Sequence, residues 1–219
     1  MTSTTTQFIQ TERIGKHIGI VILNRPQVRN AVHAGLAAEV NAYLDWFETD
    51  PDMRVGIITG NGPIFCAGGD IKENAPNVME KGGFAGFTQA RRTKPWIACL
   101  QGPAHGGGAE LTLACDFVVM AEHATMVWPG IRQGLPWRGM GPDFAVRKLP
   151  PVLFNELLLT GAPLTAKRAL QHGLVNSVVP AGTVRQEAIR LAQEVAQSPP
   201  DAVKKCMAFA REIQAMTKP

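Results

Sequence analysis

A run of three glycines, Gly106, Gly107 and Gly108, is followed two residues later by Glu110, and these residue types suit one kind of chemistry. Glycine lets a ligand approach the backbone closely, because no side chain stands in the way. The run leads into an apolar helical stretch, and the first N–H groups of a helix lack partners and carry partial positive charge. Such a terminus can hold an oxygen on which negative charge develops, with Glu110 nearby as an acid or base. The same residues also fit an ordinary helix start, in which Glu110 only interacts with the helix dipole.

Strands and helices alternate along the chain, and two of the strands lead into glycine turns. The strand expected at residues 55–59 precedes Gly68 and Gly69, and the strand expected at Trp96–Leu100 precedes the glycine run. Further strands are expected at Ile18–Leu23 and Phe117–Ala121, and helices at Ala34–Thr49, 184–197 and 201–216. The alternation predicts an α/β fold with parallel pairing. Ligands in such folds bind beyond the carboxyl ends of the strands, where both glycine turns are expected.

Composition excludes several other classes of protein. The 219 residues are 45% hydrophobic and 18% charged, with a net charge of +4 and no dense basic run, which argues against a nucleic-acid partner. No apolar stretch reaches the roughly 20 residues of a membrane span. The four cysteines show neither zinc-ligand spacing nor a disulfide framework, so we expect no metal site and a reducing compartment, the cytoplasm or an organelle matrix. Residues 1–6 are expected to form a disordered tail, and the N-terminus lacks the apolar core of a secretory signal.

Several segments in order resemble the crotonase (enoyl-CoA hydratase/isomerase) family over nearly the whole chain. They are residues 23–31 (LNRPQVRNA), 65–73 (FCAGGDIKE), 102–111 (GPAHGGGAEL) and 172–176 (HGLVN). The resemblance implies a spiral of ββα units over residues 7–180 and a helical C-terminal region over 181–219, shorter than is usual in the family. It also implies a homotrimer or a dimer of trimers, and an acyl-CoA thioester substrate. Coenzyme A then enters as part of the substrate, with no permanently bound cofactor.

The resemblance also assigns roles to individual residues. Gly69 and Gly107 would donate the two N–H groups that hold the thioester oxygen, and Glu110 would be the acid or base. The residues on the side of coenzyme A would be Val28, Arg29, Ala67, Gly69, Asp70, Ile71, Lys72 and Gly107.

One departure from the family pattern leaves the reaction open. Family hydratases use two glutamates, and the position of the second is Gly130 here. One carboxylate is able to shuttle a proton by itself, which suits double-bond isomerisation or another enolate reaction better than simple hydration. Related enolate chemistry, such as dehydration of carnitinyl-CoA, decarboxylation or thioester hydrolysis, also stays open. The alternative is a weak or inactive relative that binds coenzyme A esters.

Overall fold

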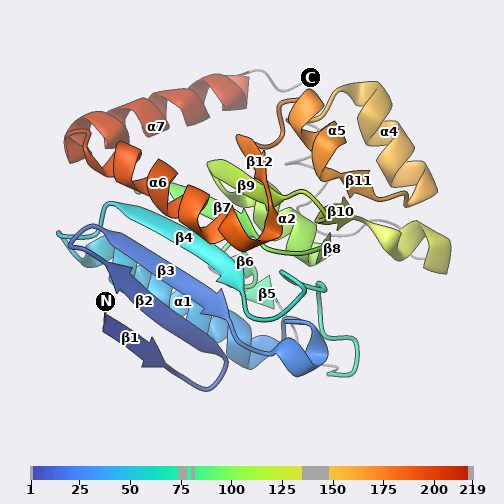
Figure 1. Cartoon of the computed structure of the whole chain (residues 1–219), viewed down its shortest axis with the longest axis horizontal. Helices are drawn as coiled ribbons and strands as arrows, with labels where there is room; N and C mark the ends of the chain where they lie inside the picture. Colours follow the sequence, from blue (N-terminus) through green and yellow to red (C-terminus); the bar gives the residue numbers. More distant parts are fainter. Residues whose placement is uncertain (1, 74–77, 80–81, 135–147, 217–219) are drawn as a thin grey trace.

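A seven-stranded sheet forms the centre of the computed structural model, which describes residues 2–73, 78–79, 82–134 and 148–216 (Figure 1). Its strand order is β1-β2-β3-β4-β7-β9-β12. The strands are β1 (Thr2–Thr5), β2 (Ile9–Ile14), β3 (Ile18–Leu23), β4 (Val55–Gly60), β7 (Trp96–Leu100), β9 (Phe117–Ala121) and β12 (Ser177–Val179). The first three pair antiparallel, and pairing from β3 to β12 is parallel. The predicted α/β fold with parallel pairing is confirmed.

Helices cover the sheet because its central strands are apolar on both faces. Every residue of β3, β4 and β7 is buried, as is usual for parallel strands. Helix α1 (Ala34–Thr49) packs against β2 and β3, and α6 (Val184–Ala196) crosses β4, β7 and β9 (Figure 1). The buried side chains of α1 recur at helical spacing: Leu36, Ala37, Val40, Leu44 and Phe47.

Shorter elements surround this sheet. A second sheet has the order β11-β10-β8, and β5 pairs with β6 in a hairpin. The remaining strands are β5 (Val78–Met79), β6 (Gly83–Phe84), β8 (Ala104–His105), β10 (Thr125–Val127) and β11 (Leu164–Thr165). The remaining helices are η1 (Pro26–Val28), α2 (Gly107–Ala114), η2 (Pro129–Gln133), α4 (Pro151–Thr160), α5 (Ala166–Gln171), η3 (Ala181–Thr183) and α7 (Pro200–Met216). No helix within the described ranges is both long and apolar enough to cross a membrane.

The N-terminal segment differs from the expectation of a disordered tail over residues 1–6. Thr2–Thr5 forms β1, which pairs with β2 in register from Thr2 opposite Arg13 to Thr5 opposite Gln10. Backbone hydrogen bonds to a neighbouring strand order this polar segment, although it buries little apolar surface. The prediction is therefore wrong for these residues.

Candidate active site at two glycine turns

The two glycine turns lie against each other although they are far apart in the sequence. A Cβ placed on Gly68 would lie 2.9 Å from the carbonyl oxygen of His105 and 3.3 Å from the backbone nitrogen of Gly107. A Cβ placed on Gly108 would lie 2.9 Å from Cβ of Cys66. Any side chain at these positions would force the turns apart, so glycine is required for the close approach. The structure thus brings together the two turns that the sequence singled out.

The backbone N–H groups of Gly69 and Gly107, predicted to be donors, lie at a parallel bridge and at the start of a helix. Gly107 is the first residue of α2, where N–H groups have no partner within the helix. Gly69 forms a parallel bridge with Val32. The N–H of Val32 donates to the carbonyl of Gly68, and the N–H of Asp70 donates to the carbonyl of Val32, both at 2.8 Å. In this pattern the N–H of the bridging residue itself points away from the partner segment. Among the backbone hydrogen bonds of the described residues, neither N–H has an acceptor outside regular elements.

Glu110 lies in the first turn of α2 and is only 5% exposed. Its N–H donates to the carbonyl of Gly106 at 3.1 Å, which closes that turn. Residues three apart share one face of a helix, and side chains point back toward the N-terminus. The Cα–Cβ bond of Glu110 therefore leaves the helix on about the same face as Gly107 and tilts toward the N-terminal end.

An ion pair fastens the turn of Gly69 to the segment that follows β3. Nη1 of Arg25 donates to Oδ2 of Asp70 at 2.9 Å and to the carbonyl of Ala31 at 2.6 Å. Burial raises the pKa of the Asp70 carboxyl, but hydrogen bonds from Arg25 and from the N–H of Lys72 outweigh it. The pKa consequently lies below its usual value. The Asp70 side chain thus holds the turn of Gly69 in place from within the protein.

Asn30 holds the same segment, and the sequence analysis assigned it no role. It is fully buried, with a left-handed φ of 55°. Its Nδ2 donates to the carbonyls of Asn61 at 2.9 Å, Ile64 at 2.8 Å and Phe65 at 3.2 Å. The only sequence signal was its place after a proline turn, because asparagine tolerates left-handed backbone.

The remaining residues predicted for coenzyme A lie along a partly open rim. The N–H of Ala67 donates to the carbonyl of Arg29 at 3.0 Å, so the two segments meet directly. Val28 is half-buried, Arg29 and Lys72 are exposed, and Ile71 is 94% exposed. An apolar side chain beside two cations suits a ligand that carries both a ring and phosphates.

His105 connects this rim to the glycine run. Burial, and then the positive charge of Arg29, hold the pKa of His105 below its usual value. The N–H of His105 donates to the carbonyl of Cys66 at 2.8 Å, and the residue after Cys66, Ala67, donates to the carbonyl of Arg29, so the rim and the second glycine turn are neighbours.

Cys66 lies within the first glycine turn but is not available as a nucleophile. Burial raises the pKa of its thiol to about 12, and the thiol donates to the carbonyl of Asn30 at 3.3 Å. Since the thiolate is the reactive form, this cysteine acts only as packing.

Gly130 follows the strand that runs beside the glycine run. β10 pairs parallel to β8 with Val127 opposite His105, and the N–H of Gly106 donates to the carbonyl of Val127 at 2.8 Å. The helical turn η2, which contains Gly130, starts directly after this strand. Gly130, where the resemblance expects the second carboxylate, therefore lies shortly after β10, and β10 pairs with the strand that leads into the glycine run.

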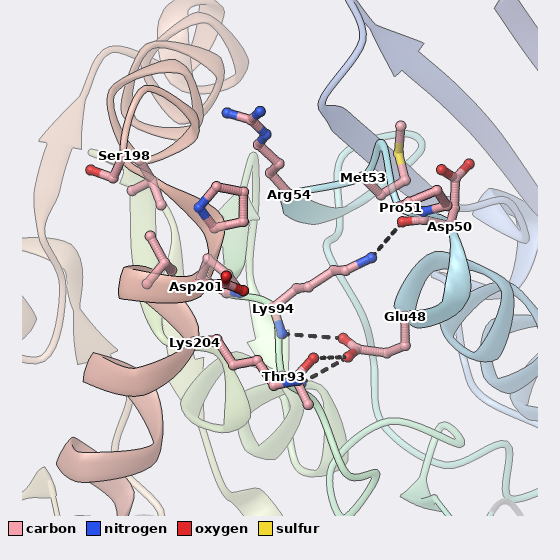
Figure 2. A pocket seen from close by; sticks show the side chains of 14 residues that line it. Glu48, Asp50, Pro51, Met53, Arg54, Thr93, Lys94, Ser198, Asp201 and Lys204 are labelled. Atoms are coloured by element: carbon pink, nitrogen blue, oxygen red, sulfur yellow. Dashed lines mark hydrogen bonds between the residues drawn. The ribbon is translucent and has the colours of Figure 1, made fainter.

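A cavity lies elsewhere in the fold, and hydrogen bonds join two of the segments that line it. It measures about 220 Å³ and lies between the end of α1, the residues before β7 and the start of α7 (Figure 2). Glu48 accepts from the N–H and the hydroxyl of Thr93, both at 2.8 Å. Nζ of Lys94 donates to the carbonyls of Phe47 and Asp50, both at 2.7 Å. These hydrogen bonds fasten the end of α1 to the residues before β7, which favours a structural role for this side of the cavity.

Comparison with known proteins agrees with this arrangement. The enoyl-CoA hydratase/isomerase family matches residues 13–219, so the chain belongs to that family and is an enzyme of the hydratase/isomerase type. It is 36% identical to a mevalonyl-coenzyme A hydratase of Aspergillus fumigatus over 198 residues, 87% of this chain and 73% of that protein. It is 39% identical to a carnitinyl-CoA dehydratase of Proteus mirabilis over 190 residues, 84% of this chain and 72% of that protein.

Solved structures show the same fold. The crystal structure of a carnitinyl-CoA hydratase from Mycobacterium avium is 37% identical with a TM-score of 0.88, covering 94% of this chain and 81% of that one. An enoyl-CoA hydratase from Mycobacterium tuberculosis H37Rv is 34% identical with a TM-score of 0.92, covering 98% and 85%. The crotonase fold predicted from the motifs is thus confirmed.

Proposed function

We propose that this enzyme binds an acyl-CoA and stabilises the thioester enolate with the N–H groups of Gly69 and Gly107, while Glu110 moves the proton. The observation that carries the proposal is the packing of the two glycine turns, with Glu110 one turn into α2. When a proton leaves the carbon next to a thioester, negative charge passes to the carbonyl oxygen. One preorganised donor for such an oxygen contributes roughly 3–4 kcal/mol in the transition state.

A single carboxylate suffices for a balanced reaction. In isomerisation, Glu110 removes a proton from one carbon of the enoyl group and returns it to another. In hydration, Glu110 takes a proton from water while the water oxygen bonds to Cβ, and the same proton then goes to Cα. In both cases the carboxylate ends in its starting state, so Gly130 at the second position does not prevent turnover.

The rim of Val28, Arg29, Ile71 and Lys72 would hold the nucleotide part of coenzyme A. The relatives include a mevalonyl-CoA hydratase and carnitinyl-CoA dehydratases, so branched or polar short acyl groups belong in the substrate panel. We take hydration or dehydration across Cα and Cβ as the first reaction to assay, and isomerisation as the second. A homotrimer or a dimer of trimers is the expected assembly, which light scattering would measure.

The test is product analysis by mass spectrometry with a panel of enoyl-CoA and 3-hydroxyacyl-CoA thioesters. Wild-type protein should convert at least one of them, and Glu110→Gln should lower kcat by about 10²- to 10⁴-fold while the protein stays folded. Equal turnover by Glu110→Gln would refute the assigned role of the carboxylate.

A second candidate is binding of coenzyme A esters without turnover, which Gly130 favours because it removes one of two family carboxylates. Tight binding of butyryl-CoA together with no product from any thioester would support it. Turnover that depends on Glu110 would refute it.

A further inference from the structure

The ring of Phe84 occupies the space that a side chain at Gly107 would fill. A Cβ placed on Gly107 would lie 2.5 Å from Cε2 and 2.7 Å from Cε1 of that ring, with Cζ also in contact. The far edge of the ring therefore touches the backbone of the proposed donor. Phe84 is 8% exposed, so the ring is nearly enclosed.

The backbone around Phe84 holds the ring in place. Gly83, Ala85 and Gly86 have left-handed φ angles of 67°, 57° and 65°. The carbonyl of Phe84 accepts from the N–H of Phe87 at 3.1 Å and of Thr88 at 3.2 Å. Nδ2 of Asn41 in α1 donates to the carbonyl of Gly86 at 2.9 Å, which ties the turn to a helix. The position of the ring is thus set by α1 and a compact turn.

Phe84 and Glu110 lie on the same face of α2. The ring lies where the Cβ of Gly107 would project, and Glu110 is three residues further along the helix. Glu110 is only 5% exposed, so its side chain is enclosed near this end of the helix. An acyl group that reaches Glu110 from Gly107 must therefore lie against Phe84.

From this geometry we propose that Phe84 is a wall of the acyl pocket and limits the enzyme to short acyl groups; this inference rests on the proposed function. A thioester oxygen held by the N–H of Gly107 places the next carbons of the acyl group along the same face of α2. A rigid ring in that place shortens the space beyond the thioester, so longer acyl chains are excluded. Pocket walls of this kind change preference by about 10-fold or more for each methylene that is admitted or refused.

The experiment is calorimetric binding of free coenzyme A, butyryl-CoA and octanoyl-CoA to wild type, Phe84→Leu and Phe84→Ala. These saturated thioesters report on the pocket even without turnover. Phe87→Leu is the matched control, since Phe87 is a fully buried phenylalanine of the same turn that packs on Trp96, with ring centroids 5.1 Å apart. Thermal unfolding of every variant shows which are folded. If Phe84→Ala does not fold, Phe84→Leu serves instead, because it retains most of the apolar volume.

Wild type should bind butyryl-CoA at least about tenfold more tightly than octanoyl-CoA. The Phe84 variants should reduce or reverse this ratio by about tenfold or more, and Phe87→Leu should leave it unchanged. An unchanged ratio in folded Phe84 variants overturns the inference and leaves the proposed function intact. Failure of wild type to bind any acyl-CoA overturns the proposed function, and this inference with it.

Discussion

The close packing of the two glycine turns makes Gly108→Ala a sharp perturbation. Gly108 supplies neither proposed donor, yet its new Cβ would lie 2.9 Å from Cβ of Cys66, with the Cys66 carbonyl also too close. Carbon atoms in contact pack at about 3.5 Å or more, so the turns must separate by at least about 0.6 Å, and by more to clear the carbonyl oxygen. The N–H groups of Gly69 and Gly107 would then no longer match one oxygen.

Gly108→Ala should lower the free energy of unfolding moderately and should lower kcat strongly. Overpacking a buried site costs typically about 1–3 kcal/mol, which lowers the Tm of a chain of this size by about 2–4 °C for each kcal/mol. A displacement of about 1 Å at reacting groups costs about 10²-fold in rate. For a separation of at least about 0.6 Å we expect kcat to fall by at least about 30-fold, which is about 2 kcal/mol of transition-state stabilisation. Binding of coenzyme A itself should change little, because the rim does not include Gly108.

The assay is steady-state turnover of the best thioester from the panel, with Tm measured on the same preparations. Gly182→Ala is the matched control, because Gly182 has no heavy atom within 4 Å of its Cβ position and no left-handed φ. A folded Gly108→Ala protein with kcat within about threefold of wild type would refute the role assigned to the paired turns.

Three further predictions concern stability and reactivity. Arg25→Gln should lower the free energy of unfolding by about 2 kcal/mol at pH 7, a value between those of exposed and buried ion pairs. Because the pKa of Asp70 is lowered in the fold, the loss relative to wild type should persist down to about pH 4 and shrink below it, as urea unfolding at several pH values would show. Asn30→Ala should lower the free energy of chemical unfolding by about 3 kcal/mol, because hydrogen bonds are lost and alanine is strained in left-handed backbone. Asn30→Gly removes only the backbone strain and should therefore be about 1 kcal/mol more stable than Asn30→Ala; equal losses in the two variants would contradict this explanation. Iodoacetamide at pH 8 should add one group to the folded protein, at Cys206, as intact mass spectrometry would show. Burial raises the pKa values of the other three thiols to between about 11 and 12, so rapid addition of more than one group would contradict that burial.

Local patterns in the sequence predicted the regular elements well. The helix expected at Ala34–Thr49 and the strands expected at Ile18–Leu23, Trp96–Leu100 and Phe117–Ala121 have the observed bounds. Each combines a clear apolar period with a terminating turn. Strand β2 was missed because its sequence, IQTERI, is largely polar, and only pairing with β3 makes it a strand.

The candidate site was predictable in its backbone and not in its side-chain surroundings. Glycines after two strands indicated close backbone approach, and the turns do pack together. The contact of Phe84 with Gly107 joins residues 23 positions apart through an irregular turn, for which no periodicity exists. The pairing of Arg25 with Asp70 likewise depends on the meeting of two loops. Long-range contacts of this kind follow from the tertiary fold and leave no local signal.

The central claim is that Glu110 and the two glycine N–H groups together form and discharge a thioester enolate. The most direct measurement is exchange of the α-protons of butyryl-CoA in D₂O, followed by mass spectrometry, since exchange requires the enolate and no particular acyl reaction. Wild type should incorporate deuterium at Cα, Gly108→Ala should do so more slowly, and Glu110→Gln should show only the background rate. Absence of exchange by wild type, or equal exchange by Glu110→Gln, would contradict the claim.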